Sequence, residues 1–169
     1  MGLDTAINLE IPLEKPIEYN SRVFETVKVE VLYLRKCWDA AQRIHDTMNS
    51  LENVTQIDDL DDWTCSDKEI IIDVLTELYE TLNKEYKALW IGRNFRAFWD
   101  RGVYLKILGD NLHDIRMAIG FLKGYTDFYH FYNSCHQIDE TDEKFFEFLI
   151  DNEVHFDVKN STLEVYNSY

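Results

Sequence analysis

Proline, glycine and cysteine are scarce in this chain, and no long apolar run is present. Only two of the 169 residues are prolines, both before residue 17, so nothing obstructs long helices after that point. Three cysteines without CxxC spacing argue against a disulfide framework or a metal site, and we predict no cofactor. A signal peptide, a lipidation motif and a run of about eighteen apolar residues are also missing, which predicts a soluble cytoplasmic protein without a membrane partner.

Basic residues are scarce as well. Seventeen lysines and arginines stand against 32 acidic residues, which gives a net charge of −15. Such a field repels bulk nucleic acid and anionic membranes. The commonest role of such a negative net charge is to keep a protein soluble, but the charge also fits a protein that imitates nucleic acid by presenting spaced carboxylates.

What the chain does contain is ample material for a core, since 46% of its residues are hydrophobic and 14% are aromatic. We predict one compact domain over residues 1–169, of α+β class and mainly α, with three or four helices packed on a small antiparallel sheet. Alternating apolar residues over 3–11 predict a first strand that ends at the prolines. Apolar residues spaced by three and four predict a central helix from about Asn20 to Asn49, although residues 26–31 also alternate like a strand.

The rest of the chain continues this pattern. A capping box at Ser66 predicts a helix through Trp90, and Asp110 can cap another that stops at Gly124. The aromatic stretch 125–135 alternates like a strand. Residues 138–169 carry nine acidic residues against two lysines, and we interpret them as an acidic C-terminal extension formed by a short helix and a β-hairpin.

No catalytic residues can be assigned. None of the five histidines stands in an HExxH, HxH or GxSxG context. Cys135 and His136 are adjacent, and neighbouring side chains point apart in a strand, which disfavours a Cys–His pair. Enzymatic activity is therefore uncertain, and we predict a non-enzymatic protein.

Two groups of basic residues are candidate anion sites. Arg35, Lys36, Arg43 and His45 are predicted to lie along the central helix, where they could grip a phosphate. The alternative is an internal ion pair between an arginine and Asp4, which would tie the first strand to that helix.

The second group lies in residues 84–106, where six basic residues outnumber two acidic ones and aromatic residues are interleaved. Aromatic faces stack on bases and arginines grip phosphate, so a nucleotide could bind there. The alternative is that the aromatic residues belong to the core and the cations form a solvated face. The candidate ligand-binding residues of this group are Trp90, Arg93, Arg96, Trp99 and Arg101.

Acidic residues form two clusters that could contact a partner. Four aspartates stand in the loop after the central helix, with the wrong spacing for an EF-hand, and four acidic residues open the C-terminal extension. We predict that they form an acidic surface which steers the protein to a host protein with a basic surface. These residues are Asp58, Asp59, Asp61, Asp62, Asp139, Glu140, Asp142 and Glu143.

Several short motifs carry a resemblance. The chain opens with MGLD, continues with YLRK and IH over residues 33–45, and later has DD at 61–62 and DFYHFYNSC over 127–135. In this order they resemble a family of small uncharacterised bacteriophage proteins that begin MGLDMY and contain a YWRKANAIH-like helix. The likeness covers about residues 1–136, and Leu34 stands in place of the family tryptophan unless Trp38 supplies it one helical turn later.

The resemblance implies a phage gene expressed in a bacterial host, and it implies no reaction. The function we expect is a non-enzymatic accessory protein, monomeric or a small homo-oligomer, that acts in the host cytoplasm. It would bind and inhibit a host factor, with an anti-defence role as the leading case. The alternatives are a sponge that sequesters a nucleotide or cyclic nucleotide, and an uncharacterised enzyme acting on a nucleotide.

Overall fold

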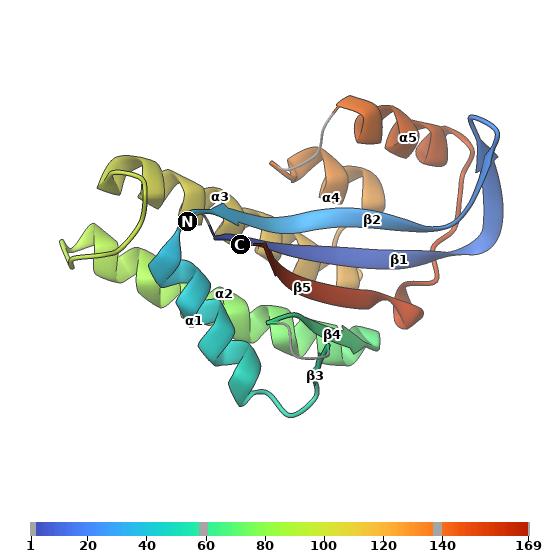
Figure 1. The fold of residues 1–169 in the computed structure, drawn as a ribbon. Coiled ribbons are helices and arrows are strands. Elements are labelled where there is room, and N and C mark those ends of the chain that lie inside the picture. Colours follow the sequence, from blue (N-terminus) through green and yellow to red (C-terminus); the bar gives the residue numbers. More distant parts are fainter. Residues whose placement is uncertain (1–2, 58–60, 137–139, 169) are drawn as a thin grey trace.

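A computed structural model describes residues 3–57, 61–136 and 140–168. In these residues an antiparallel sheet of five strands packs with five α-helices (Figure 1). The predicted α+β class is confirmed, but the helices outnumber the expected three or four and the sheet is larger than expected. The elements are β1 Asp4–Tyr19, β2 Arg22–Arg35, α1 Trp38–Ser50, β3 Thr55–Gln56, β4 Trp63–Ser66, α2 Lys68–Trp90, α3 Arg101–Leu122, α4 Phe128–Ser134, α5 Glu140–Asp151, a 3₁₀ turn Val158–Asn160 and β5 Thr162–Ser168.

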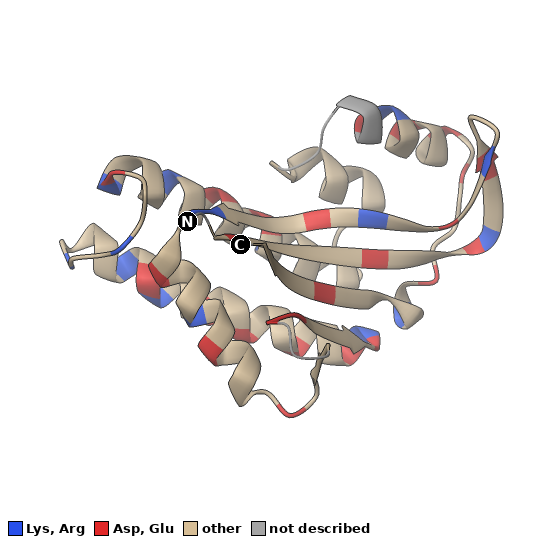
Figure 2. Ribbon diagram, viewed as in Figure 1, with Lys and Arg blue, Asp and Glu red and all other residues tan. Residues whose placement is uncertain are grey.

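The strand order is β2-β1-β5-β4-β3, and every neighbouring pair is antiparallel. The acidic segment 138–169 therefore supplies the central strand, which joins β1 to β4. Odd-numbered residues of β1, with Ile7, Leu9 and Ile11 fully buried, face the helices, as the alternation predicted. Figure 1 shows the opposite face of β2, β1 and β5 without a helix in front of it, and Figure 2 shows acidic residues on all three strands there.

Residues 22–35 form strand β2, so the prediction of one helix from about Asn20 to Asn49 is wrong in its first half. A β-bulge explains the misleading pattern. Ile7 pairs with Leu32 and Asn8 pairs with Glu30, which leaves Val31 as an extra residue on β2. The bulge shifts the alternation by one position, so three of the buried residues, Val27, Val31 and Leu34, stand at gaps of four and three and imitate a helix.

The prolines do not end β1 as predicted. Pro12 still pairs with Thr26 on β2, and the second register shift lies between Pro12 and Ile17. Pairing between β1 and β5 stops at Glu10, so Pro12 lies where β1 is no longer flanked by β5. A residue without an N–H is tolerated there, because no ladder bond to β5 is needed.

The predicted strand at residues 125–135 is a helix instead. Asp127 caps α4 by accepting a hydrogen bond from the backbone N–H of His130 at 2.8 Å. Phe128, Phe131 and Tyr132 are buried at helical spacing, and their rings pack on one another. The favourable cap and the spacing of three and four outweigh the local alternation.

The predicted C-terminal β-hairpin does not form. Phe156 makes an isolated bridge to Leu13 of β1, and the residues after it form the 3₁₀ turn. β5 then pairs with β1 and β4 rather than with residues 155–158. Two helix starts also differ, because α2 is capped by Asp67 rather than Ser66, and α3 by Asp100 rather than Asp110.

A side chain of α3 forms hydrogen bonds with the edge of β2. The buried Asn111 accepts a hydrogen bond from the backbone N–H of Tyr33 at 2.9 Å and donates one to its carbonyl at 3.1 Å. The amide thus replaces the neighbouring strand that Tyr33 would otherwise require. This contact also fixes α3 against β2.

Candidate functional site

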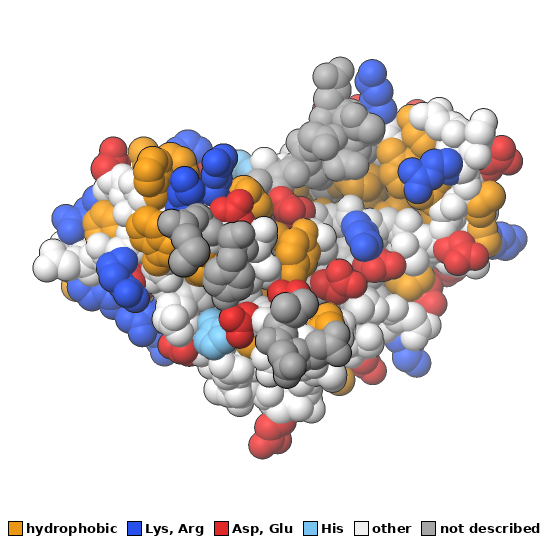
Figure 3. All heavy atoms as spheres, in the orientation of Figure 1, with side chains coloured by type: hydrophobic (Ala, Val, Ile, Leu, Met, Phe, Trp, Pro, Cys, Tyr) orange, Lys and Arg blue, Asp and Glu red, His pale blue; other side chains and the backbone are white. Residues whose placement is uncertain are grey.

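Lys and Arg gather at the end of the molecule where α2 ends and α3 begins (Figures 2 and 3). The connection between these helices, residues 91–100, has no regular secondary structure and carries two arginines. We call this region the basic pole. It is defined by Arg43, Lys87, Trp90, Ile91, Arg93, Arg96, Phe98 and Arg101.

The connection 91–100 is held against the start of α1. Asp39 bonds it twice, because its carboxylate accepts from the backbone N–H of Arg96 at 2.7 Å and its own N–H donates to the Arg96 carbonyl at 3.1 Å. The N–H of Phe98 donates to the Lys36 carbonyl at 2.9 Å, and the Trp99 indole donates to the Arg35 carbonyl at 2.6 Å. These bonds order the connection 91–100 although it lacks a helix or strand of its own.

The hydroxyl of Tyr104 completes the start of α1. It accepts a hydrogen bond from the N–H of Ala40 at 2.9 Å, in a helix whose N-cap residue, Cys37, makes no side-chain cap. Burial, and then the nearby Glu85 carboxylate, raise the pKa of Tyr104. Burial likewise raises the pKa of the Cys37 thiol to about 12, so both groups stay neutral in the folded protein.

Arginines from α1 and from the connection converge on a pocket of about 360 Å³. Arg93 is 2.5 Å from the Glu85 carboxylate oxygen Oε2, and Arg43 is 3.5 Å from the same atom. Arg96 makes a 3.0 Å ion pair with Asp39. The three cations therefore share two carboxylates. The pocket is lined by Asp39, Gln42, Arg43, Arg93, Asn94 and Arg96.

Glu85 is the unusual member of this group, because its side chain is only 1% exposed. Among the described residues its second carboxylate oxygen, Oε1, has no hydrogen-bond partner. All of its stabilisation therefore comes through Oε2 from two guanidinium groups that remain half-exposed. Arg43 and Arg93 thus have a structural role in keeping a buried charge paired.

Arg101 serves the fold rather than the pocket. Its guanidinium donates to the backbone carbonyls of Gly92 and Arg93 at 3.3 and 3.1 Å, and it lies over the ring of Phe95 at 5.6 Å. Gly92 adopts a φ of +98°, a conformation that favours glycine, where the chain leaves α2. Arg101 therefore closes the turn by satisfying two of its carbonyl groups.

The aromatic residues of the pole divide into two sets. Phe95 and Trp99 pack on the core, as the core interpretation of the segment expected. Trp90 is instead 71% exposed, Ile91 84% and Phe98 61%. Exposed large apolar side chains that stand close in sequence to arginines match the composition found at the centres of protein interfaces.

The first predicted anion site, with its basic residues along one helix, does not form. Arg35 ends strand β2 and Lys36 stands in the turn before α1, with a φ of +54°, so neither lies on a helix with Arg43. Lys36 instead lies over the ring of Phe98 at 4.8 Å. His45 contacts Asp61 at 3.7 Å and Asn49 at 2.9 Å, and its ring meets Trp63 edge-on. The structure therefore unites Arg43 with Arg93 and Arg96, which the sequence had assigned to separate groups.

The predicted acidic surface is only partly described. Asp58, Asp59 and Asp139 lie outside the described residues, as do the side chains of Glu140 and Asp142 within α5. Glu143 is exposed on α5. Asp62 is engaged internally, because its carboxylate accepts from the N–H of Asn167 at 2.9 Å, and the Asp61 carbonyl accepts from the Asn167 side chain.

No family model matches the chain, and no curated protein or solved structure matches it either. None of the helices in the described part of the chain is both long and apolar enough to cross a bilayer.

Sequence reasoning missed Asp39, Gln42 and Asn94 as lining residues of the pocket, and it missed Glu85 as the carboxylate that pairs with two of its arginines. Glu85 carried a weak signal, since it is one of only two acidic residues among six cations in residues 84–106. Asp39 carried none, because its partner Arg96 is 57 residues away.

Proposed function

We propose that this chain is a non-enzymatic binding protein whose contact surface is the basic pole, and that its partner is a protein with an acidic surface patch. One observation carries the proposal. Trp90, Ile91 and Phe98 are exposed within nine residues of sequence, beside Arg93 and Arg96, in a chain whose net charge is −15. Such a surface is costly to leave in water, and it suits a contact with apolar anchors and a ring of charge.

The charge distribution supports an acidic partner over a basic one. The pole is cationic, whereas the open face of the sheet carries Glu10, Glu30 and Glu164 (Figure 2). A molecule with opposite charges on two sides is oriented as it approaches a charged surface. Because of the resemblance to bacteriophage proteins, we propose that this partner is a host factor of an infected bacterium, a defence component included, and that the chain inhibits it.

A capture experiment with matched variants tests this proposal. The parent chain serves as bait in lysate from host cells, beside a Trp90→Ala/Phe98→Ala double variant and a Tyr125→Ala control. Tyr125 is 82% exposed but follows α3, outside the pole. We expect one host protein to bind the parent and the control, and to be lost from the double variant. Equal capture by all three baits would contradict the role of the pole.

The expected acidic contact surface stays a prediction, and association kinetics separate it from the pole. Neutralising Asp139, Glu140, Asp142 and Glu143 should slow association with a basic partner, whereas it should leave association with an acidic partner unchanged or faster. Raised salt should slow association in either case, which confirms electrostatic steering without giving its sign.

The arginine pocket favours a second candidate function, a sponge for a nucleotide or cyclic nucleotide. Its volume of about 360 Å³ and its three guanidinium groups suit a phosphate with an attached base. Arg96 is the cation best able to turn to a ligand, because its side chain is 75% exposed. A nucleotide that binds there should raise the melting temperature by mass action.

Mono-, di- and cyclic nucleotides can therefore be screened by thermal shift against the parent, Arg96→Ala and Arg22→Ala. Arg22 is a matched control, since it is exposed at the β1–β2 turn and lies over Phe24. A rise that is lost in Arg96→Ala and kept in Arg22→Ala would establish the sponge. We expect no shift in the parent, because Asp39 and Glu85 already pair the three arginines.

A further inference from the structure

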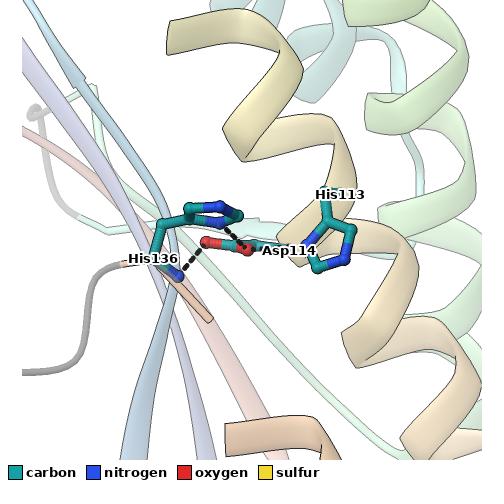
Figure 4. A group of neighbouring side chains, drawn as sticks. All are labelled: His113, Asp114 and His136. Carbon is teal, nitrogen blue, oxygen red and sulfur yellow. Dashed lines mark hydrogen bonds and ion pairs between the residues drawn. The ribbon is translucent and has the colours of Figure 1, made fainter. Parts of the chain in front are cut away.

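A cluster of metal-binding side chains lies on α3, away from the basic pole. His113 and Asp114 are adjacent on this helix, and His136 follows α4 (Figure 4). One ligand atom from each of the three residues lies within 4.8 Å of the other two. In Figure 4 the Asp114 carboxylate lies between the two imidazoles.

The carboxylate of Asp114 is fully buried, and three contacts orient it. Its Oδ2 accepts from the backbone N–H of His136 at 2.9 Å. Its Oδ1 is 2.7 Å from Nδ1 of His136 and 3.3 Å from Nδ1 of His113. Because the backbone bond fixes one oxygen, the other is aimed at both imidazoles.

We propose that His113, Asp114 and His136 bind one divalent transition-metal ion of the Zn²⁺ class. Ligands about 2.0–2.2 Å from such an ion stand roughly 3.3 Å apart in a tetrahedron. The separations of 2.7 and 3.3 Å between Asp114 and the two histidines are close to that value. Coordination requires the His136 ring to move away from Asp114 and the two imidazoles, whose ligand atoms lie within 4.8 Å of each other, to close around the ion. The proton between His136 and Asp114 then leaves to solvent.

A second contact supports the site independently. The other ring nitrogen of His136, Nε2, is 3.6 Å from Asp110 Oδ1. A metal-binding histidine usually directs its second N–H to a carboxylate, which fixes the ring and strengthens it as a ligand. Asp110 occupies that place one turn before Asp114 on α3, and it is itself held by Lys106 at 2.7 Å.

The chemistry of the donors sets the class of ion. Two imidazoles and one carboxylate suit Zn²⁺, Co²⁺ or Ni²⁺, whereas Mg²⁺ and Ca²⁺ require oxygen ligands. Both histidines are half-exposed, so water can take a fourth position. Cys135 is adjacent in sequence, but burial raises the pKa of its thiol and its Sγ donates to the Phe131 carbonyl, so we exclude it from the ligand set.

Calorimetry on chelator-treated protein tests the site with Zn²⁺ as the probe. We expect one equivalent to bind, and His113→Ala and His136→Ala each to lose this saturable binding. Asp110→Asn should keep the stoichiometry and weaken the affinity by about 10–100-fold, as the loss of an outer partner does. The matched control is His130→Ala, which removes a surface histidine paired to Asp127 at the same 2.7 Å distance outside the cluster.

Co²⁺ provides a second readout. Visible absorption bands of a four- or five-coordinate ion are expected, without the intense near-ultraviolet band of a thiolate ligand. The proposal is overturned if the parent shows no saturable binding, if both cluster variants bind like the parent, or if His130→Ala removes the binding. A thiolate band would also overturn it, because Cys135 would then be a ligand. Urea melts of each metal-free variant check that lost binding does not reflect unfolding.

Discussion

Replacing Glu85 by Gln tests whether the basic pole depends on a buried charge. Gln keeps the shape of the side chain, and its carbonyl can still accept from Arg93. Its amide then takes the place of Oε1, which has no partner among the described residues. The substitution therefore removes the charge and exchanges one buried acceptor for a donor.

The magnitude follows from the two contacts. A hydrogen bond to a charged group contributes about 1.5–3 kcal/mol and a neutral one about 0.5–1.5, so the exchange should cost about 1 kcal/mol at the 2.5 Å contact with Arg93. The longer 3.5 Å contact with the half-exposed Arg43 adds less, because solvent screens it. Glu85→Ala should cost about 3 kcal/mol, since it also leaves a cavity.

Urea unfolding followed by circular dichroism measures these values. A double-mutant cycle with Arg93→Met isolates the pair, and we expect a favourable coupling of about 1 kcal/mol. The refuting result is a Glu85→Gln protein as stable as the parent or more stable. That outcome would mean that the cost of burying the carboxylate exceeds the attraction of both arginines.

Further predictions concern the core, a helix cap and the buried thiols. Trp63→Ala should lower the free energy of unfolding by about 3–5 kcal/mol in the same melts, because Trp63 is buried. Trp38→Ala should lower it clearly less, because Trp38 is half-buried, and equal losses would contradict this difference in burial. Asp127→Ala should cost about 1 kcal/mol by removing the cap of α4, and Asp127→Asn should restore most of it. Cys37 and Cys65 should resist a thiol reagent until the protein is unfolded, and all three cysteines should then react. Burial raises the pKa of the Cys37 thiol to about 12 and that of the Cys65 thiol to about 11. The free energy of unfolding should therefore be retained at neutral pH and fall as pH rises above about 8.5, where the thiols of the unfolded chain ionise. A Cys37→Ala variant with the same alkaline loss of stability would show that another group is responsible.

Patterns that depend on near neighbours in sequence were predicted well. The alternation over residues 3–11 gave the first part of β1, and the leucine spacing after residue 70 gave α2 through Trp90. The errors arose where one pattern fits two structures. The bulge at Val31 converts strand alternation into helical spacing, and in residues 125–135 aromatic alternation and helical spacing coexist until the Asp127 cap decides between them.

The candidate sites were predictable only in part, because they depend on contacts between distant residues. The sequence indicated that Arg93 and Arg96 were candidates, but not that the connection 91–100 docks on α1 and brings Arg43 to them. The histidine cluster was invisible for the same reason, since His136 is 22 residues from Asp114 and no spacing motif links them. A site formed by residues so far apart in sequence can be recognised only when the packing of the fold is known.

The position of β5 has a consequence for the order in which the sheet can assemble. The β1–β2 pair and the β3–β4 pair each join strands close in sequence, but β5 alone links the two pairs, and its partners in β1 lie about 160 residues earlier in the chain. Closing so long a loop is entropically expensive before its contacts form, and distant pairing slows folding. Refolding should therefore produce the two hairpins and the helices first, with the continuous sheet completed in a later and slower step.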